Sequence, residues 1–161
     1  METILGEDQL KQYNLITSGL SEVIGERHLK EKIVSGPVKI YWGTAPTGIP
    51  TIGYLCPMKK IADMLKANTE ITILFADLHA FLDSMKSPLE LVKLRTKVYE
   101  QVIKGALDAL NVDHSKIKFV LGSSFQLTPE YQLDIFKLGN ICSVHDAQRA
   151  GTEVVKQNKN P

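Results

Sequence analysis

The chain has 161 residues, of which 43% are hydrophobic and 23% charged, and its formal net charge is +1. This length and composition are ordinary for one folded domain, and the small net charge excludes a whole-chain field that would attract nucleic acid. Its two cysteines, Cys56 and Cys142, exclude a disulfide framework and indicate a reducing compartment, so we expect the cytoplasm.

The sequence carries no membrane or metal signal. No apolar run approaches the roughly 20 residues that a membrane-spanning helix needs, and the acidic N-terminus has no apolar signal core. The four histidines, His28, His79, His114 and His145, are scattered along the chain. Cys142 and His145 form a spaced pair with no second pair to complete a tetrahedral set, so we expect no metal site.

Residues 1–36 are predicted to form an N-terminal helical segment. Apolar side chains recur at helical spacing over residues 8–25, and a second short helix is expected over residues 27–34. The breaker cluster Ser-Gly-Pro at residues 35–37 should end it.

A strand, a loop, a helix and a second strand are expected next. Residues 38–42 are rich in β-branched and aromatic side chains, which favours a strand. Residues 43–50 combine glycine and proline in a way that excludes regular structure, and residues 52–67 return to helical spacing. Residues 71–76 are nearly all apolar, which is typical of a strand buried on both faces of a parallel sheet.

A long helix should follow the second strand. Ser87 is predicted as its N-cap, with Pro88 at the first helical position and Glu90 completing a capping box. We expect this helix to run to about Leu110.

A third strand is expected over residues 117–121, closed by Gly122. A last helical segment should begin after its cap at Thr128, break near Asn140 and continue to about Val155.

This element order predicts the fold class. Three strands separated by helices make two crossovers, which predicts an α/β fold with a parallel three-stranded sheet, the first half of a doubly wound sheet. Ligands bind such folds beyond the carboxyl ends of the strands. Three segments are expected there: residues 43–50, 77–79 and 122–124.

The loop after the first strand is a candidate anion site. Gly43 and Gly48 bracket a strand-to-helix connection, and a helix N-terminus offers free N–H groups that suit a triphosphate. The spacing matches neither a Walker loop nor a dinucleotide-binding fingerprint. On spacing alone a turn without a ligand is the alternative reading.

Three segments of the chain resemble one protein family. They are Lys39–Gly48 (KIYWGTAPTG), Thr72–Asp83 (TILFADLHAFLD) and Ala150–Gln157 (AGTEVVKQ). In this order they resemble tyrosyl-tRNA synthetases of the eukaryotic and archaeal type, which are class I aminoacyl-tRNA synthetases. The resemblance extends from about Leu15 to Pro161.

The resemblance implies a Rossmann catalytic domain in a homodimer. Such an enzyme activates tyrosine with ATP, which binds together with Mg²⁺, and then transfers the tyrosine to tRNA(Tyr). Residues 37–124 would be the first half of that domain. Residues 125–161 would lead into the dimerisation region, with contacts over residues 125–155. The rest of the tyrosine pocket and a lysine-rich loop would lie beyond Pro161, so the chain alone is expected to be inactive. The alternatives are a shortened non-catalytic paralogue that binds a partner or a nucleotide, and a plain nucleotide-binding module.

The resemblance assigns four residues to tyrosine binding. Tyr41 would lie in the tyrosine pocket, and Gly43 would place backbone against the substrate. Asp77 would hold the tyrosine ammonium or a neighbouring polar group, and His79 would border the site. The alternatives are a half-buried strand aromatic for Tyr41, a helix cap for Asp77 and a structural histidine for His79.

The resemblance also assigns the loop to ATP. The residues implied in nucleotide binding are Thr44, Pro46, Thr47, Gly48 and Gly53.

The class I signature, whose archetype reads His-Ile-Gly-His, would correspond to residues 51–54, Thr-Ile-Gly-Tyr. Tyrosine is usual at the fourth position in this branch, and Tyr54 matches it. Thr51 and Tyr54 are thus the implied catalytic residues, but Thr51 stands where the family has histidine. A threonine is shorter and never cationic, and the loss of one transition-state donor costs about 10²–10³ in rate. Thr51 is also a good helix N-cap.

Overall fold

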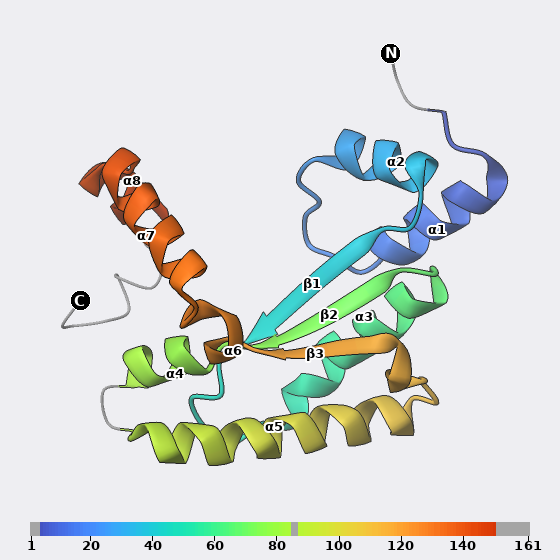
Figure 1. The fold of residues 1–161 in the computed structure, drawn as a ribbon. Helices are drawn as coiled ribbons and strands as arrows, with labels where there is room; N and C mark the ends of the chain where they lie inside the picture. Colours follow the sequence, from blue (N-terminus) through green and yellow to red (C-terminus); the bar gives the residue numbers. More distant parts are fainter. Residues whose placement is uncertain (1–3, 85–86, 151–161) are drawn as a thin grey trace. The chain divides into compact units, whose positions relative to one another are not determined.

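The computed structural model describes residues 4–84 and 87–150 (Figure 1). The chain divides into two compact units, one ending at Gly122 and the other beginning at Ser123. None of the helices in the described ranges combines the length and hydropathy of a membrane span.

The first unit is built on a parallel sheet. Its strands are β1 (Lys39–Thr44), β2 (Glu70–Phe75) and β3 (Ile117–Leu121), and they lie in the order β1-β2-β3. Helix α3 (Leu55–Lys66) follows β1, and α5 (Leu89–Ala109) lies between β2 and β3. The predicted α/β fold with a three-stranded parallel sheet is therefore confirmed.

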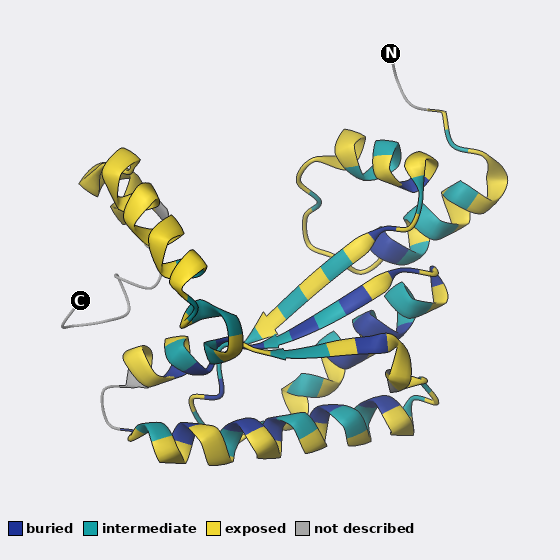
Figure 2. Cartoon of the chain, in the orientation of Figure 1, coloured by how far each residue is buried: buried dark blue, intermediate teal, exposed yellow. Residues whose placement is uncertain are grey.

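Helices α3 and α5 cover one face of this sheet. The side chains of β2 that point to this face, Ile71, Ile73 and Phe75, are buried. They form one cluster with residues of both helices and β3, namely Met58, Ile61, Tyr99, Ile103, Leu107 and Ile117. Figure 2 shows the buried residues alternating along β2 and following one side of α5.

The opposite face of the sheet is more open. It carries the alternate side chains of the strands, and Leu74 and Val120 there are only half-buried, while Tyr41 and Lys118 are exposed. The predicted burial of β2 on both faces is therefore wrong within the described residues, because α3 and α5 both pack on the same side.

Helices α1 (Glu7–Thr17) and α2 (Glu26–Ser35) form a smaller cluster around Ile16, Ile33 and Val38. The predicted helix over 8–25 is too long, because α1 ends at Thr17. The chain leaves the helical conformation at Ser18, with ψ of 137°, and Gly19 follows with φ of 70°, a left-handed conformation typical of helix ends.

The N-terminal helix is tied to α3 by a lysine. The Lys60 ammonium donates to the carbonyl oxygens of Leu15 at 2.9 Å and Ser18 at 2.7 Å, at the end of α1. Such bonds satisfy carbonyls that a helix C-terminus leaves without partners. Burial lowers the pKa of Lys60.

The start of α5 also differs from the prediction. The helix begins at Leu89, so Pro88 occupies the cap position with ψ of 153°, one residue later than expected. The Ser87 hydroxyl accepts a hydrogen bond from Arg95 at 2.8 Å, a bond across two helical turns that the capping pattern did not predict.

Short helices connect these elements. Helix α4 (Asp77–Ser84) follows β2, and the 3₁₀ turns η1 (Ile52–Tyr54) and η2 (His114–Lys116) precede α3 and β3.

The second unit contains α6 (Ser123–Gln126), α7 (Pro129–Ile141) and α8 (Val144–Ala150). Thr128 caps α7 as predicted, since its hydroxyl accepts from the Tyr131 N–H. The break falls at Cys142, two residues after the predicted one. The expected continuation to Val155 and most of the third resemblance segment, residues 151–157, lie outside the described residues.

Candidate functional site

The ends of the three strands, where the predicted segments begin, lie side by side at the carboxyl edge of the sheet. The Ala76 N–H donates to the Thr44 oxygen at 2.9 Å, which joins the ends of β1 and β2. The Gly122 N–H donates to the Phe75 oxygen at 2.8 Å, which joins β3 to β2. This edge is where parallel α/β sheets bind ligands, so we take it as the candidate site.

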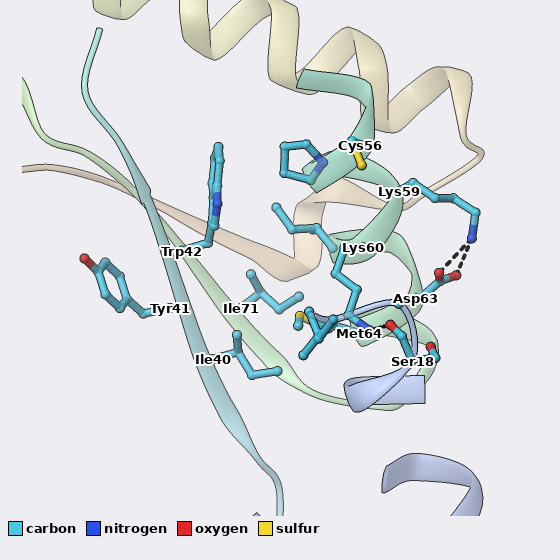
Figure 3. A pocket seen from close by; sticks show the side chains of 14 residues that line it. Ser18, Ile40, Tyr41, Trp42, Cys56, Lys59, Lys60, Asp63, Met64 and Ile71 are labelled. Atoms are coloured by element: carbon cyan, nitrogen blue, oxygen red, sulfur yellow. Dashed lines mark hydrogen bonds and ion pairs between the residues drawn. The ribbon is translucent and has the colours of Figure 1, made fainter. Parts of the chain in front are cut away.

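Tyr41 and Gly43 make a platform on the open face of β1. Tyr41 is 68% exposed, and Figure 3 shows its ring on the side of β1 away from α3. A Cβ added at Gly43 would lie 3.1 Å from the Tyr41 hydroxyl oxygen and 3.3 Å from Cε2. Only glycine at position 43 therefore lets the Tyr41 ring lie along the strand without displacement.

The loop from Ala45 to Pro50 has one fixed end and an exposed centre. Pro46 is fully buried, whereas Thr47 and Ile49 are exposed. The Thr47 N–H donates to the Ala45 oxygen at 2.8 Å, which folds the loop tightly. From α5, the Arg95 guanidinium donates to the Thr47 carbonyl oxygen at 2.8 Å.

Tyr54 is half-buried and faces inward. Its hydroxyl lies 2.7 Å from the Thr44 hydroxyl, and its ring makes edge contacts with Trp42 and Tyr99, with centroids 6.3 Å and 5.4 Å away. Tyr54 therefore joins the end of β1 to α5. Its predicted catalytic role stays a prediction.

Tyr99 of α5 is one partner of Tyr54 in these ring contacts, and no sequence pattern predicted it. It is 3% exposed, and its ring makes an edge contact with the Tyr54 ring. Burial raises the pKa of Tyr99, and the neighbouring Tyr54 adds to that rise, while the Gly48 backbone and the Arg95 charge oppose it. Nothing in its position signals this, because Tyr99 occupies an ordinary inward position of an amphipathic helix.

Thr51 occupies the N-cap position of η1, but its side chain does not make the capping bond that a threonine there predicts. The Tyr54 N–H donates to the Thr51 carbonyl oxygen at 3.0 Å, and the side chain makes no capping bond. Thr51 is exposed, and a Cβ at Gly53 would lie 3.4 Å from its hydroxyl oxygen. The Thr51 side chain is thus at the surface beside the start of α3.

Asp77 and His79 occupy different environments. Asp77 is 1% exposed and begins α4, where the helix dipole stabilises a negative charge. His79 is exposed, two residues further along the same helix. Within the described residues, no cluster of three or more His, Cys, Asp or Glu is arranged to hold a metal ion.

A separate apolar pocket of about 540 Å³ lies beside β1 (Figure 3). Ile40, Trp42 and Met64 line it, and the ion pair of Lys59 with Asp63, 2.7 Å long, stands at its rim. Among the predicted site residues in the described ranges, Tyr41 alone contributes to this lining. An apolar lining does not suit a triphosphate, so this pocket is not a candidate for the nucleotide.

Comparison with known proteins decides the family. The sequence profile described as tRNA synthetases class I (W and Y) matches residues 34–161. The chain belongs to this family. The match covers the sheet, the loop and the second unit.

Several relatives within this synthetase family are tyrosine–tRNA ligases by name. The chain is 54% identical over 151 residues to the cytoplasmic tyrosine–tRNA ligase of Danio rerio, covering 94% of this chain and 28% of the relative. It is 54% identical over 156 residues to the cytoplasmic enzyme of Saccharomyces cerevisiae, covering 96% of this chain and 40% of the relative. The chain thus spans less than half the length of these relatives.

Solved synthetase structures have the same fold. A tyrosyl-tRNA synthetase from Archaeoglobus fulgidus, complexed with L-tyrosine, superposes with a TM-score of 0.83 at 32% identity, over 95% of this chain and 47% of that one. The enzyme from Aeropyrum pernix, at 24% identity and a TM-score of 0.78, covers 89% of this chain and 43% of that one, and supports the fold alone.

Proposed function

We propose that this chain supplies the first half of the catalytic site of a tyrosine–tRNA ligase, which activates tyrosine with ATP and transfers it to tRNA(Tyr). The observation that carries this proposal is the loop at the carboxyl end of β1. Its centre is exposed, its backbone is held by Arg95, and it leads through the 3₁₀ turn η1 into the N-terminus of the 12-residue helix α3. Membership of the synthetase family is the reason to assign ATP-dependent activation of tyrosine to this loop.

The loop is proposed to bind ATP, with Mg²⁺ arriving as part of the nucleotide substrate. Backbone N–H groups at the start of α3 and the helix dipole favour the negative phosphates. Gly48 and Gly53 allow a ligand close to the backbone, while Thr44, Pro46 and Thr47 shape the loop.

Tyrosine is proposed to lie on the open face of β1. The ring of Tyr41 and the bare backbone at Gly43 form a flat surface against which an aromatic substrate can pack. Asp77 stands at the same sheet edge, where a carboxylate suits the substrate ammonium, and the exposed His79 borders it.

The predicted three-part organisation extends this proposal. Residues 1–36 form an N-terminal helical segment, residues 37–124 the first half of the catalytic domain, and residues 125–155 the dimer contact. The second unit exposes apolar side chains that a partner subunit would cover: Leu133, Ile135, Phe136, Leu138 and Ile141. The cytoplasmic names of the relatives support a cytoplasmic location.

A chimera tests the proposed activity. Residues 1–161 replace the matched segment of the Saccharomyces cerevisiae ligase, and exchange of labelled pyrophosphate into ATP is measured with tyrosine, phenylalanine or tryptophan. We expect exchange with tyrosine and at least about 10²-fold less with the other two, because a site that bonds the substrate hydroxyl rejects analogues without it. Exchange that requires tryptophan would contradict the tyrosine assignment.

The threonine at position 51 favours one second candidate, a paralogue that binds the nucleotide without activating tyrosine. In that case the chimera is folded and binds ATP, but exchanges no pyrophosphate with any of the three amino acids. The same assay therefore separates the two functions.

A further inference from the structure

Arg95 of α5 lies against the candidate ATP loop. It is 48 positions from Thr47 in the sequence, yet its Nη1 atom donates to the Thr47 carbonyl oxygen at 2.8 Å. The same Nη1 atom donates to the hydroxyl oxygen of the buried Ser87 at 2.8 Å. These bonds hold the guanidinium beside the loop, although the Arg95 side chain is only half-buried.

The guanidinium of Arg95 keeps N–H groups that these bonds do not use. A guanidinium donates from Nε, Nη1 and Nη2, and both bonds described above come from Nη1. Within residues 4–84 and 87–150, Nε and Nη2 of Arg95 donate to no protein atom. The N–H groups on these two atoms form a planar fork that matches the oxygens of a phosphate or a carboxylate.

The positive charge of Arg95 also has no carboxylate beside it. The α5 positions one turn before and after it carry valine, leucine and tyrosine, so its own helix offers no acidic neighbour. Lys104, further along α5, is paired with Glu100 at 2.6 Å, but Arg95 forms no ion pair with any of the described residues. A charge held partly out of water without a counter-ion favours an anionic ligand at this place.

We propose that Arg95 binds a phosphate group of ATP through Nε and Nη2, while Nη1 keeps its bonds to Thr47 and Ser87. This inference rests on the proposed function and adds one substrate-contacting residue to it. The phosphate is the part of ATP that is both anionic and rich in oxygen acceptors, as the fork requires. Arginine suits the contact better than lysine, because its rigid fork can bond two phosphate oxygens at once.

The yeast chimera carrying Arg95→Met tests this contact, and Arg95→Lys keeps the charge but loses the fork. We expect the KM for ATP to rise about 10- to 10²-fold in Arg95→Met, and by less in Arg95→Lys. The inhibition constant of adenosine, which has no phosphate, should stay within about threefold of the wild-type value in both variants. Lys97→Met is the matched control, since it removes one positive charge from an exposed position of the same helix, and both constants should stay unchanged in it.

Equal rises in the adenosine constant and in the KM for ATP would overturn the proposal, because Arg95 would then hold the loop without contacting the phosphates. An unchanged KM for ATP in Arg95→Met would overturn it as well, provided that the wild-type chimera is active. A wild-type chimera without activity would refute the proposed function instead, and the binding measurement below would then decide on Arg95.

A readout independent of activity uses the isotope-labelled 161-residue chain. The Arg95 Nε–H signal, assigned by its loss in Arg95→Lys, is followed by NMR while ATP, inorganic pyrophosphate or adenosine is added. We expect this signal to shift with ATP and with pyrophosphate but not with adenosine. Loop amides that shift with ATP while the Arg95 signal does not would overturn the phosphate contact. The absence of both shifts would contradict ATP binding by the loop, and Arg95 binding with it.

Discussion

Replacing Thr51 with histidine in the yeast chimera is expected to raise the rate of tyrosine-dependent pyrophosphate exchange about 10²–10³-fold. Histidine is the residue that the class I signature places at this position, and its imidazole can donate to a phosphate oxygen as charge develops in the transition state. Threonine offers a shorter, neutral donor. The gain should appear in kcat, because this interaction is made mainly in the transition state.

The fold should tolerate the larger side chain at position 51. Thr51 is exposed, its hydroxyl makes no capping bond, and the neighbouring Gly53 has no side chain to obstruct it. Surface changes of this kind usually alter stability by less than about 0.5 kcal/mol. Thr51→Asn is the matched control, since asparagine is polar but has no cationic form, and it should give no such gain. Equal rates for the histidine and asparagine variants would show that position 51 does not contact the reacting phosphate.

Replacing Ile73 with alanine is expected to destabilise the 161-residue chain by about 2–5 kcal/mol. Ile73 is fully buried at the centre of the middle strand, between α3 and α5, so its truncation leaves a cavity in the main core. Thermal unfolding followed by circular dichroism should show the midpoint falling by about 2–4 °C for each kcal/mol.

Leu74→Ala is the control for that substitution. Leu74 is the next residue of the same strand, but it points to the open face and is half-buried. Its truncation should cost roughly half as much or less, because less apolar area leaves contact with protein. Similar losses at both positions would mean that the two faces of β2 are equally covered, contrary to the arrangement described above.

The sheet was predictable because its strands carry the signals that do not depend on distant parts of the chain. Short runs of β-branched or apolar residues, separated by segments with helical spacing, predict the bounds of β1, β2 and β3 to within one or two residues. The end of α1 was not predictable in this way, since the apolar spacing continues past Thr17, although the backbone leaves the helix at Ser18 and Gly19 is left-handed.

The candidate site was predictable only in part. The loop and the segment at Asp77 follow from strand ends and from the family resemblance. The hydrogen bond from the Ala76 N–H to the Thr44 oxygen brings them together. Arg95 and Tyr99 were not predicted, because their contacts with Thr47 and with the Tyr54 ring join positions far apart in the sequence and have no local pattern. The open face of the sheet was also not predicted, because the sequence of an apolar strand does not indicate on which face of the sheet the helices pack.

The central claim is that the loop between β1 and α3 binds ATP. The measurement that tests it most directly is a titration of the isotope-labelled 161-residue chain with millimolar ATP, followed by amide chemical shifts in two-dimensional NMR. The account predicts that the largest shifts fall on Thr47, Gly48 and residues 51–54, with little change in α1 and α2. Shifts that avoid this loop, or that concentrate around the apolar pocket beside Trp42, would contradict it.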